Sequence, residues 1–330
     1  MAKKGFTLPA LGARVWDAVR AGGPPAADPL AVALVRRALD AGLSLLDAGP
    51  AEVSPATEGL IALGLHGRSS PVQVNVTLCG EVGSDRPPGG HAADARSLIP
   101  RDGVLGPDPA RWGDDLSAAI TRALHRLQRD QISIGWLDAG ALPASRDAQV
   151  RRRLDEEPRL GSWGIRFDGA PPDPAMLVEL AGLGIPFFGL ELHLLNAGLG
   201  RSWLEALHQL GATVVDLDPH AGGRLNGAVL RRGPLGAAFH ESRPEEWSLV
   251  RTRLQPVTRL GYLTQRTGRT LAQAAIRYAL DLPAVRCALL TVDEPTVLPE
   301  WLNGPGVPAL SVEELRRLEE ATPGAAGGLG

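Results

Sequence analysis

Three charged side chains close predicted β-strands, and they are the first candidates for chemistry. These residues are Asp47, Asp138 and Arg166. A carboxyl group with a raised pKa beside an ionised one can work as a general acid and base pair. A guanidinium can neutralise part of that charge, or bind the carboxylate or phosphate of a substrate. The chain therefore carries groups for acid and base chemistry, provided that the fold brings the strand ends together.

The pattern of elements predicts a fold that does so. Short β-branched runs alternate with longer amphipathic segments, which is typical of repeated β–α units and a parallel sheet. The predicted strands are Ala10–Arg14, Leu43–Asp47, Val72–Leu78, Ile132–Asp138, Ser162–Arg166, Phe187–Leu192, Thr213–Asp218 and Arg286–Leu290. The predicted helices include Leu30–Ala41, Asp115–Leu127, Pro174–Leu183, Ser202–Leu210 and Thr270–Leu280. Eight strands favour a closed (β/α)8 barrel, an α/β fold whose active sites lie where the strands end.

Length and composition indicate one cytoplasmic domain. We expect residues 1–322 to form a single barrel with long loops near 80–112 and 224–247, each a functional lid or disordered, and residues 323–330 to form a disordered tail. The net charge of −3 indicates neither nucleic acid nor membrane as a partner. Cys79 and Cys287 form no metal or disulfide motif, and no signal peptide or membrane span is predicted. A small-molecule substrate is expected, and a protein partner stays open.

Several segments, in order, resemble the aldo-keto reductase family. Leu34 to Asp47 resembles the helix and second strand that end on the family's catalytic Asp, and Pro50 resembles the branch that includes L-fucose and galactose dehydrogenases. Asp216 to Gly227 is similar to the family's S-P-L-A-G-G-x-L-T-G segment, and Ala309 to Leu315 to its closing L-S-x-E-E-L helix. The resemblance implies a (β/α)8 barrel with an Asp, Tyr, Lys and His tetrad that serves hydride transfer.

By the same alignment, most of that tetrad is replaced. Asp47 matches the Asp, but Glu52 stands at the Tyr position, Leu78 at the Lys position and Asp138 at the His position. The residues implied to hold nicotinamide also differ, since Arg166 and Phe167 stand at its Ser-Asn pair, Gly189 at its Gln and Leu217 at its stacking Tyr. Only Gly222 and Gly223 survive as cofactor-binding residues. We therefore expect no cofactor and no metal, with NADP(H) binding retained only if the alignment is wrong.

Under this alignment the replaced site is a cup of carboxylates. Asp47, Glu52 and Asp138 would project from neighbouring strand ends as catalytic groups, and their mutual repulsion would raise at least one pKa. Such a group suits elimination, isomerisation or cyclisation. The candidate substrate-binding residues around it are Trp16, Arg166, Glu191, His193 and His220.

Each of these residues also has a structural interpretation. Asp47 could hold its strand end, Asp138 could be a turn residue, and Arg166 could pair with a carboxylate. Glu52 and both histidines could be solvated charges or satisfied polar groups. No spaced motif such as H-E-x-x-H supports a metal at the histidines.

Three functions follow from the resemblance and the replacements. The leading hypothesis is a repurposed, cofactor-independent enzyme of bacterial specialised metabolism. The chain is rich in Ala, Arg, Gly and Pro, which fits a high-GC genome. The second is a noncatalytic pseudoenzyme that acts as a partner or ligand-binding protein. The third is a divergent NAD(P)H-dependent oxidoreductase. A fold hosts many functions, so the barrel itself does not choose among them.

Overall fold

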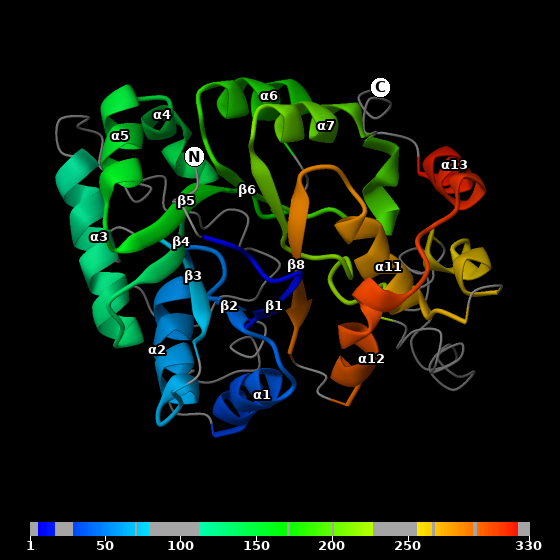
Figure 1. The fold of residues 1–330 in the computed structure, drawn as a ribbon, viewed down its shortest axis with the longest axis horizontal. Helices are drawn as coiled ribbons and strands as arrows, with labels where there is room; N and C mark the ends of the chain where they lie inside the picture. The colour runs from blue at the N-terminus through cyan, green and yellow to red at the C-terminus, as the bar shows by residue number, and fades with distance from the viewer. Residues whose placement is uncertain are drawn as a thin grey trace, which may run out of the picture.

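Eight parallel strands close into a barrel in the computed structural model, with helices around it (Figure 1). The structure describes residues 6–16, 29–69, 71–78, 112–169, 172–199, 201–226, 256–265, 268–292 and 296–322. Each strand pairs with the next along the chain, and β1 pairs with β8 through Leu11 to Arg14 and Ala288 to Thr291. The strand ends therefore meet at one mouth, as the sequence predicted.

The elements have the following bounds. The strands are β1 Leu11–Arg14, β2 Leu45–Asp47, β3 Gln73–Thr77, β4 Ile132–Asp138, β5 Leu160–Arg166, β6 Phe187–Leu190, β7 Thr213–Asp216 and β8 Val285–Thr291. The α-helices are α1 Pro29–Asp40, α2 Ser54–Leu65, α3 Trp112–Leu127, α4 Leu142–Ser145, α5 Ala148–Glu156, α6 Pro174–Gly182, α7 Ser202–Gln209, α11 Leu271–Leu280, α12 Leu298–Leu302 and α13 Val312–Ala321. Short 3-10 turns are η5 Ala139–Ala141, η6 Leu194–Leu199, η7 Gly261–Thr264 and η8 Gly304–Gly306.

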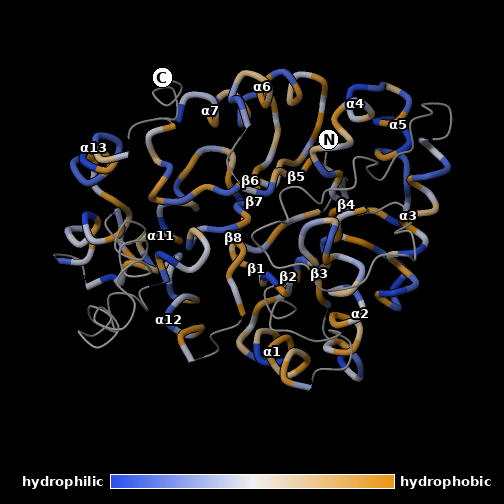
Figure 2. Tube along the Cα trace, turned by 180° about the vertical axis from the view of Figure 1, so that it is seen from behind, coloured by the Kyte–Doolittle hydropathy of each residue, from blue (hydrophilic) through white to orange (hydrophobic). Residues whose placement is uncertain are grey.

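Two apolar regions hold the barrel together. The interior cluster consists of Leu45, Ile134, Trp136, Phe187, Val215, Leu217, Cys287 and Leu289. A larger cluster joins the outward faces of the strands to the helices. Figure 2 shows this arrangement as hydrophobic strands inside helices of mixed hydropathy. Alternation along each strand therefore sends one set of side chains inward and the other toward the helices.

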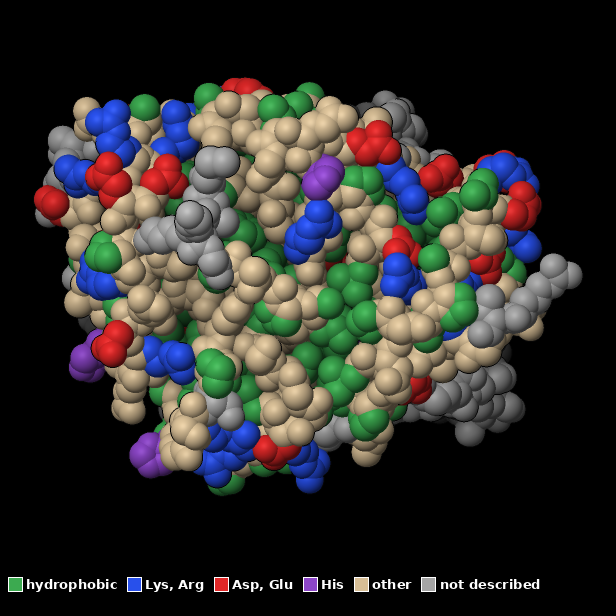
Figure 3. Space-filling view, in the orientation of Figure 1, with side chains coloured by type: hydrophobic (Ala, Val, Ile, Leu, Met, Phe, Trp, Pro, Cys, Tyr) green, Lys and Arg blue, Asp and Glu red, His purple; other side chains and the backbone are tan. Residues whose placement is uncertain are grey.

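Helix ends follow local sequence signals. Thr270 and Ser311 precede α11 and α13 and form capping boxes. In each box the side chain of the capping residue accepts the backbone N–H three residues later, and the side chain of that later residue accepts the N–H of the capping residue. Asp147 and Asp173 cap α5 and α6 with their carboxylates. On the face shown in Figure 3, hydrophobic side chains gather near the middle, and charged ones lie mainly toward the margin. The caps satisfy backbone N–H groups at the helix starts, and the apolar faces of the helices hold them against the barrel.

The predicted fold class is confirmed, and some finer predictions fall outside the described residues. The loop near 80–112 lies outside them except for its last residue, the loop near 224–247 except for its first three, and the tail 323–330 altogether. Over the part of the chain that is described, no helix is long and apolar enough to cross a membrane.

Candidate functional site

The interior changes from apolar to charged toward the mouth of the barrel. Trp136 belongs to the interior cluster, so Asp138, two residues further along β4, lies on the same side of the strand at its end. Asp47 at the end of β2 contacts Trp136, and Arg166 at the end of β5 contacts Asp47. The upper interior is thus built from ionisable groups at the ends of β2, β4 and β5, and Arg166 reaches Asp47 from a strand that is not its neighbour.

Asp47 joins three parts of the chain at the end of β2. The residue is fully buried, and its Oδ1 accepts hydrogen bonds from Gly49 N at 2.9 Å and Arg166 Nη1 at 2.7 Å. Its Oδ2 accepts one from Trp136 Nε1 at 3.1 Å. These three donors satisfy both carboxylate oxygens, and the place of Asp47 in the structure fits the strand-end interpretation.

Arg166 bridges two carboxylates and is 1% exposed. Its Nε donates to both oxygens of Asp168 at 2.9 Å, and its Nη2 lies 2.8 Å from Asp168 Oδ1. Burial by itself lowers the pKa of Arg166, but Asp168 and Asp47 together raise it above its ordinary value. The sequence pointed to Arg166 as a substrate-binding residue, whereas its described contacts are with Asp47 and Asp168. Asp168 was missed, although its position two residues after Arg166 places it on the same side of the chain.

Trp16 covers the charged layer. Its ring is 4% exposed, with the guanidinium carbon of Arg14 at 4.4 Å and that of Arg166 at 5.7 Å from the ring centroid. Guanidinium groups at these distances are attracted by the aromatic face. The ring fits only because residue 49 is glycine, since a Cβ there would lie 2.5 Å from Trp16 Cγ, and φ is +91°. Trp16 therefore lies at the mouth, as predicted, and shields both cations.

Asp138 lies near two other carboxylates at the mouth, those of Glu52 and Asp168. Burial raises its pKa, the Ala141 N–H that it accepts at 3.1 Å lowers it, and the charges of Glu52 and Asp168 raise it again. Glu52 itself is exposed. The predicted cup is thus brought together in part, with Asp138 and Glu52 close enough to interact and Asp47 held beneath Arg166. Asp138 also caps η5, which fits its interpretation as a turn residue.

A second charged arm joins β1 to the turn after β7. Arg14 Nη1 lies 2.7 Å from Asp218 Oδ1, and both side chains are more than nine-tenths buried. Asp218 Oδ2 accepts the N–H of Gly222 at 2.5 Å. Gly222 and Gly223 have φ of +67° and +80°, a conformation that favours glycine. Sequence reasoning missed Arg14 and Asp218, although each ends a predicted strand.

Glu191 and His193 follow β6 beside this arm. Both are partly buried. Burial raises the pKa of Glu191, and the nearby Asp218 and Asp168 raise it further. The pKa of His193 is lowered to about 4, chiefly by burial. The charge of Asp218 raises it, and that of Arg224 lowers it further. The predicted binding residue Glu191 is therefore at the mouth, and His193 is held as a neutral ring.

His220 lies against the helical shell. It is 2% exposed, and its ring centroid lies 4.6 Å from that of Trp301 on α12. This contact fits a packing role better than substrate binding. Within the described part of the chain, no group of three or more His, Cys, Asp or Glu residues could hold a metal ion.

The end of β3 corrects one step of the alignment. Leu78, assigned to the family's Lys position, belongs to the outer cluster between strands and helices. Thr77 lies one residue before it, and its Oγ1 donates to Gly49 O at 2.6 Å. A one-residue shift along a strand moves a side chain to the opposite face. The Lys position therefore cannot be assigned to Leu78 on geometry.

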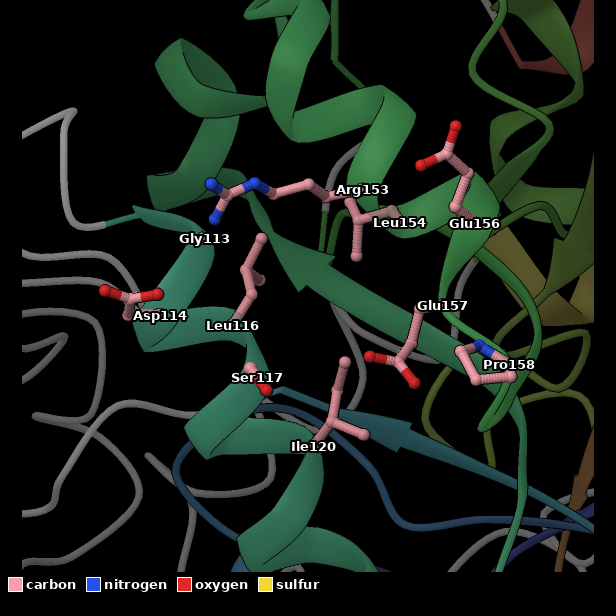
Figure 4. A pocket seen from close by; sticks show the side chains of 10 residues that line it. All are labelled: Gly113, Asp114, Leu116, Ser117, Ile120, Arg153, Leu154, Glu156, Glu157 and Pro158. Atoms are coloured by element: carbon pink, nitrogen blue, oxygen red, sulfur yellow. The ribbon is translucent and has the colours of Figure 1, made fainter.

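A separate pocket of about 360 Å3 lies on the outside, between α3 and α5. Figure 4 shows Arg153 reaching from α5 over the start of α3, with Leu116 and Ile120 on the α3 side. Glu157 at its edge already pairs with Arg159. None of the residues that line this pocket belongs to the mouth, so we place the candidate site at the strand ends.

Comparison with solved structures decides the fold family. A glycerol dehydrogenase from Gluconobacter oxydans has a TM-score of 0.67 and 18% identity, with 97% of this chain and 94% of that chain covered. An aldo-keto reductase from Bacillus halodurans in its holo form has a TM-score of 0.64 and 18% identity, covering 95% and 92%. This is the fold of the aldo-keto reductases. No protein-family model matches the chain, and no curated protein matches it either.

The aldo-keto reductase fold brings a correction about the cofactor. An aldo-keto reductase from Klebsiella pneumoniae, solved with NADP and acetate, has a TM-score of 0.57 and 18% identity, covering 97% of this chain and 93% of that chain. This finding contradicts our expectation that no cofactor is used. The expectation rested on single residues aligned at strand ends, which are a weaker guide than the whole fold that this chain shares with the NADP complex. Much of the chain beyond Gly222 and Gly223 also lies outside the described residues.

Proposed function

We propose that this chain is a nicotinamide-dependent oxidoreductase that binds a dinucleotide across the mouth of its barrel. The proposal is supported by the aldo-keto reductase fold and by the NADP complex of a protein that shares it. The single observation that carries it to this chain is the turn after β7, where Gly222, Gly223 and Arg224 stand together. It replaces the hypothesis of an enzyme without a cofactor.

The turn has the properties that a pyrophosphate needs. A side chain at Gly222 would meet no atom of the described residues within 4 Å, so this part of the chain leaves the backbone open to close approach. Arg224 adjoins it, and its Nε is oriented by a hydrogen bond to Ala221 O at 2.9 Å. Phosphates are commonly bound by glycine-rich backbone together with a cation. Gly222, Gly223 and Arg224 therefore fit the phosphate half of the cofactor.

The reaction then requires a proton at the mouth. Bound there, the cofactor would supply a hydride to a carbonyl carbon, or accept one from an alcohol carbon. The protein must deliver one proton to the oxygen in the first direction and remove it in the second. Asp138 is our proposed donor and acceptor, because burial, Glu52 and Asp168 raise its pKa. Asp47 and Arg166 would hold the strand ends around it.

Cofactor binding is the first test. We expect the full chain to change the fluorescence of NADPH or NADH on titration, and Arg224→Ala to weaken binding about tenfold, the value of one charge-assisted hydrogen bond. Arg152→Ala is the matched control, because it removes the same charge from the exposed part of α5 and should leave the affinity unchanged. Absence of binding of either cofactor by the wild-type chain would overturn the proposal and favour the noncatalytic pseudoenzyme.

Proton transfer is the second test. With NADPH and a panel of small aldehydes and polyols, Asp138→Asn should bind NADPH as before and lose about 10²- to 10⁴-fold in kcat. Because the protonated form of Asp138 donates in reduction and the ionised form accepts in oxidation, carbonyl reduction should slow and alcohol oxidation should speed up as the pH rises through its raised pKa. A variant that turns over as fast as the wild type would remove Asp138 from the reaction.

A further inference from the structure

Asp216 is a buried acid that the proposed reaction does not use. It is the last residue of β7, between Val215 and Leu217, both of which face the barrel interior. Asp216 therefore faces the helices and is fully buried. A buried carboxyl group destabilises the fold unless its oxygens are hydrogen-bonded.

One oxygen of Asp216 ties together the chain after β6 and the chain after β7. Its Oδ1 accepts the N–H of Leu192 at 3.0 Å and the N–H of Asp218 at 3.0 Å. Asp218 in turn pairs with Arg14 and accepts the N–H of Gly222. The contacts thus run from Asp216 through Asp218 to the double-glycine turn.

The surroundings of Asp216 favour its uncharged form. Burial raises its pKa well above the ordinary value, the two N–H donors lower it, and the charges of Asp218 and Glu191 raise it again. Tyr278 on α11 belongs to the same outward cluster, and burial chiefly raises its pKa to about 12. Cys287 lies on the interior face of β8, and burial chiefly raises its pKa as well. A second anion here would repel the Asp218 carboxylate that holds both Arg14 and Gly222.

We propose that Asp216 is a positioning residue for the Gly222–Gly223 turn, acting through Asp218 and in its neutral acid form. The effect of Asp216 on dinucleotide binding rests on the proposed function, whereas its effect on the turn does not. The neutral acid supplies a carbonyl oxygen as acceptor and adds no charge next to Asp218. Among the residues that the structure describes, Oδ2 has no hydrogen-bond partner, so an amide NH2 in its place loses none of these contacts.

The test compares Asp216→Asn, which keeps the acceptor, with Asp216→Leu, which removes it at similar size. Tyr278→Phe is the matched control, because it alters a buried group that faces Asp216 without touching either loop amide. Amide hydrogen exchange at Leu192, Asp218 and Gly222 is measured in the whole chain, together with the affinity for NADPH. For Asp216→Leu we expect exchange at all three amides to be about tenfold faster and NADPH binding about tenfold weaker.

For Asp216→Asn we expect both measurements to stay within about threefold of the wild type, because an amide oxygen accepts the same two N–H groups. If Asp216→Asn behaves like Asp216→Leu, the neutral form is wrong. If Asp216→Leu keeps its protection, or Tyr278→Phe loses it equally, the positioning role is wrong. If the wild type binds no NADPH, the proposed function fails, while the exchange data still decide the role of Asp216.

Discussion

The two ends of the barrel interior are stabilised by different physics. The lower end is filled by Leu45, Ile134 and Phe187, and Phe6 closes it with its ring centroid 5.8 Å from that of Phe187. The upper end is filled by ion pairs that link one strand end to another. Apolar packing is non-directional and tolerates exchange, whereas each ion pair requires one partner in one place. The difference separates the half that keeps the barrel closed from the half that sets its chemistry.

The largest effect is expected from breaking the upper end at Arg166. Arg166→Met leaves Asp47 buried without its cation and should lower the free energy of unfolding by about 3–5 kcal/mol. Urea unfolding followed by circular dichroism measures it. The double variant Asp47→Asn, Arg166→Met removes both charges and should recover part of the loss. Equal losses in the single and double variants would show that the unpaired charge of Asp47 is not what destabilises Arg166→Met.

At the lower end, the effect should depend on volume and not on charge. Leu45→Ala should cost about 2–5 kcal/mol, because it removes buried methyl groups and leaves a cavity. The loss should be the same from about pH 5 to about pH 8, since no titrating group in the interior cluster changes charge there. Urea unfolding at both pH values checks this. A strongly pH-dependent loss would mean that the two ends are not independent.

His193 should make the upper end sensitive to acid. Its folded pKa of about 4 lies below its ordinary 6.5, so the ring favours the folded state when neutral. This stability is complete above about pH 6.5 and is lost as the pH falls toward about 4, by at most about 3 kcal/mol because part of the ring is exposed. His193→Gln should remove that part of the acid dependence, measured as Tm against pH. An unchanged acid slope would exclude His193 as its source.

The smallest effect is expected outside the barrel, where charge pairs are solvated. Arg316 on α13 pairs with Glu313 and Glu320, and all three side chains are more than half exposed. Arg316→Ala should therefore change the free energy of unfolding by less than about 1 kcal/mol. Added salt should have little further effect on this variant. A loss as large as that of Arg166→Met would contradict the idea that burial decides the strength of these pairs.

Most of the fold was predictable because strands and helices follow periodic patterns. Val72–Leu78 was predicted and Gln73–Thr77 is observed, so the strand was found although its inward face was misassigned by one residue at Leu78. Periodicity locates a strand but does not fix which aligned residue faces inward at a fraying end. The barrel could therefore be predicted from the sequence, whereas the side chains that face its mouth could not.

The site was predictable only as a set of strand ends. Asp47, Asp138 and Arg166 could be placed at one face because the strands are parallel. Their partners could not be chosen from the sequence, because Asp168 and Asp218 reach the arginines through chain that bends after the strands. Ion pairing depends on side-chain directions, which residue spacing does not determine. The proposal of Asp47 as a catalytic acid therefore took no account of Arg166 and Trp136, which bond to it.

The pairing of β1 with β8 has a consequence for synthesis of the chain. The first strand made, at Leu11 to Arg14, finds its second neighbour only when residues 285–291 have left the ribosome. Until then β1 and β7 each present an unpaired strand edge, the kind of surface on which chains aggregate. Truncation before Val285 should therefore yield chains that depend on chaperones, whereas truncation after Thr322 spares every strand of the barrel.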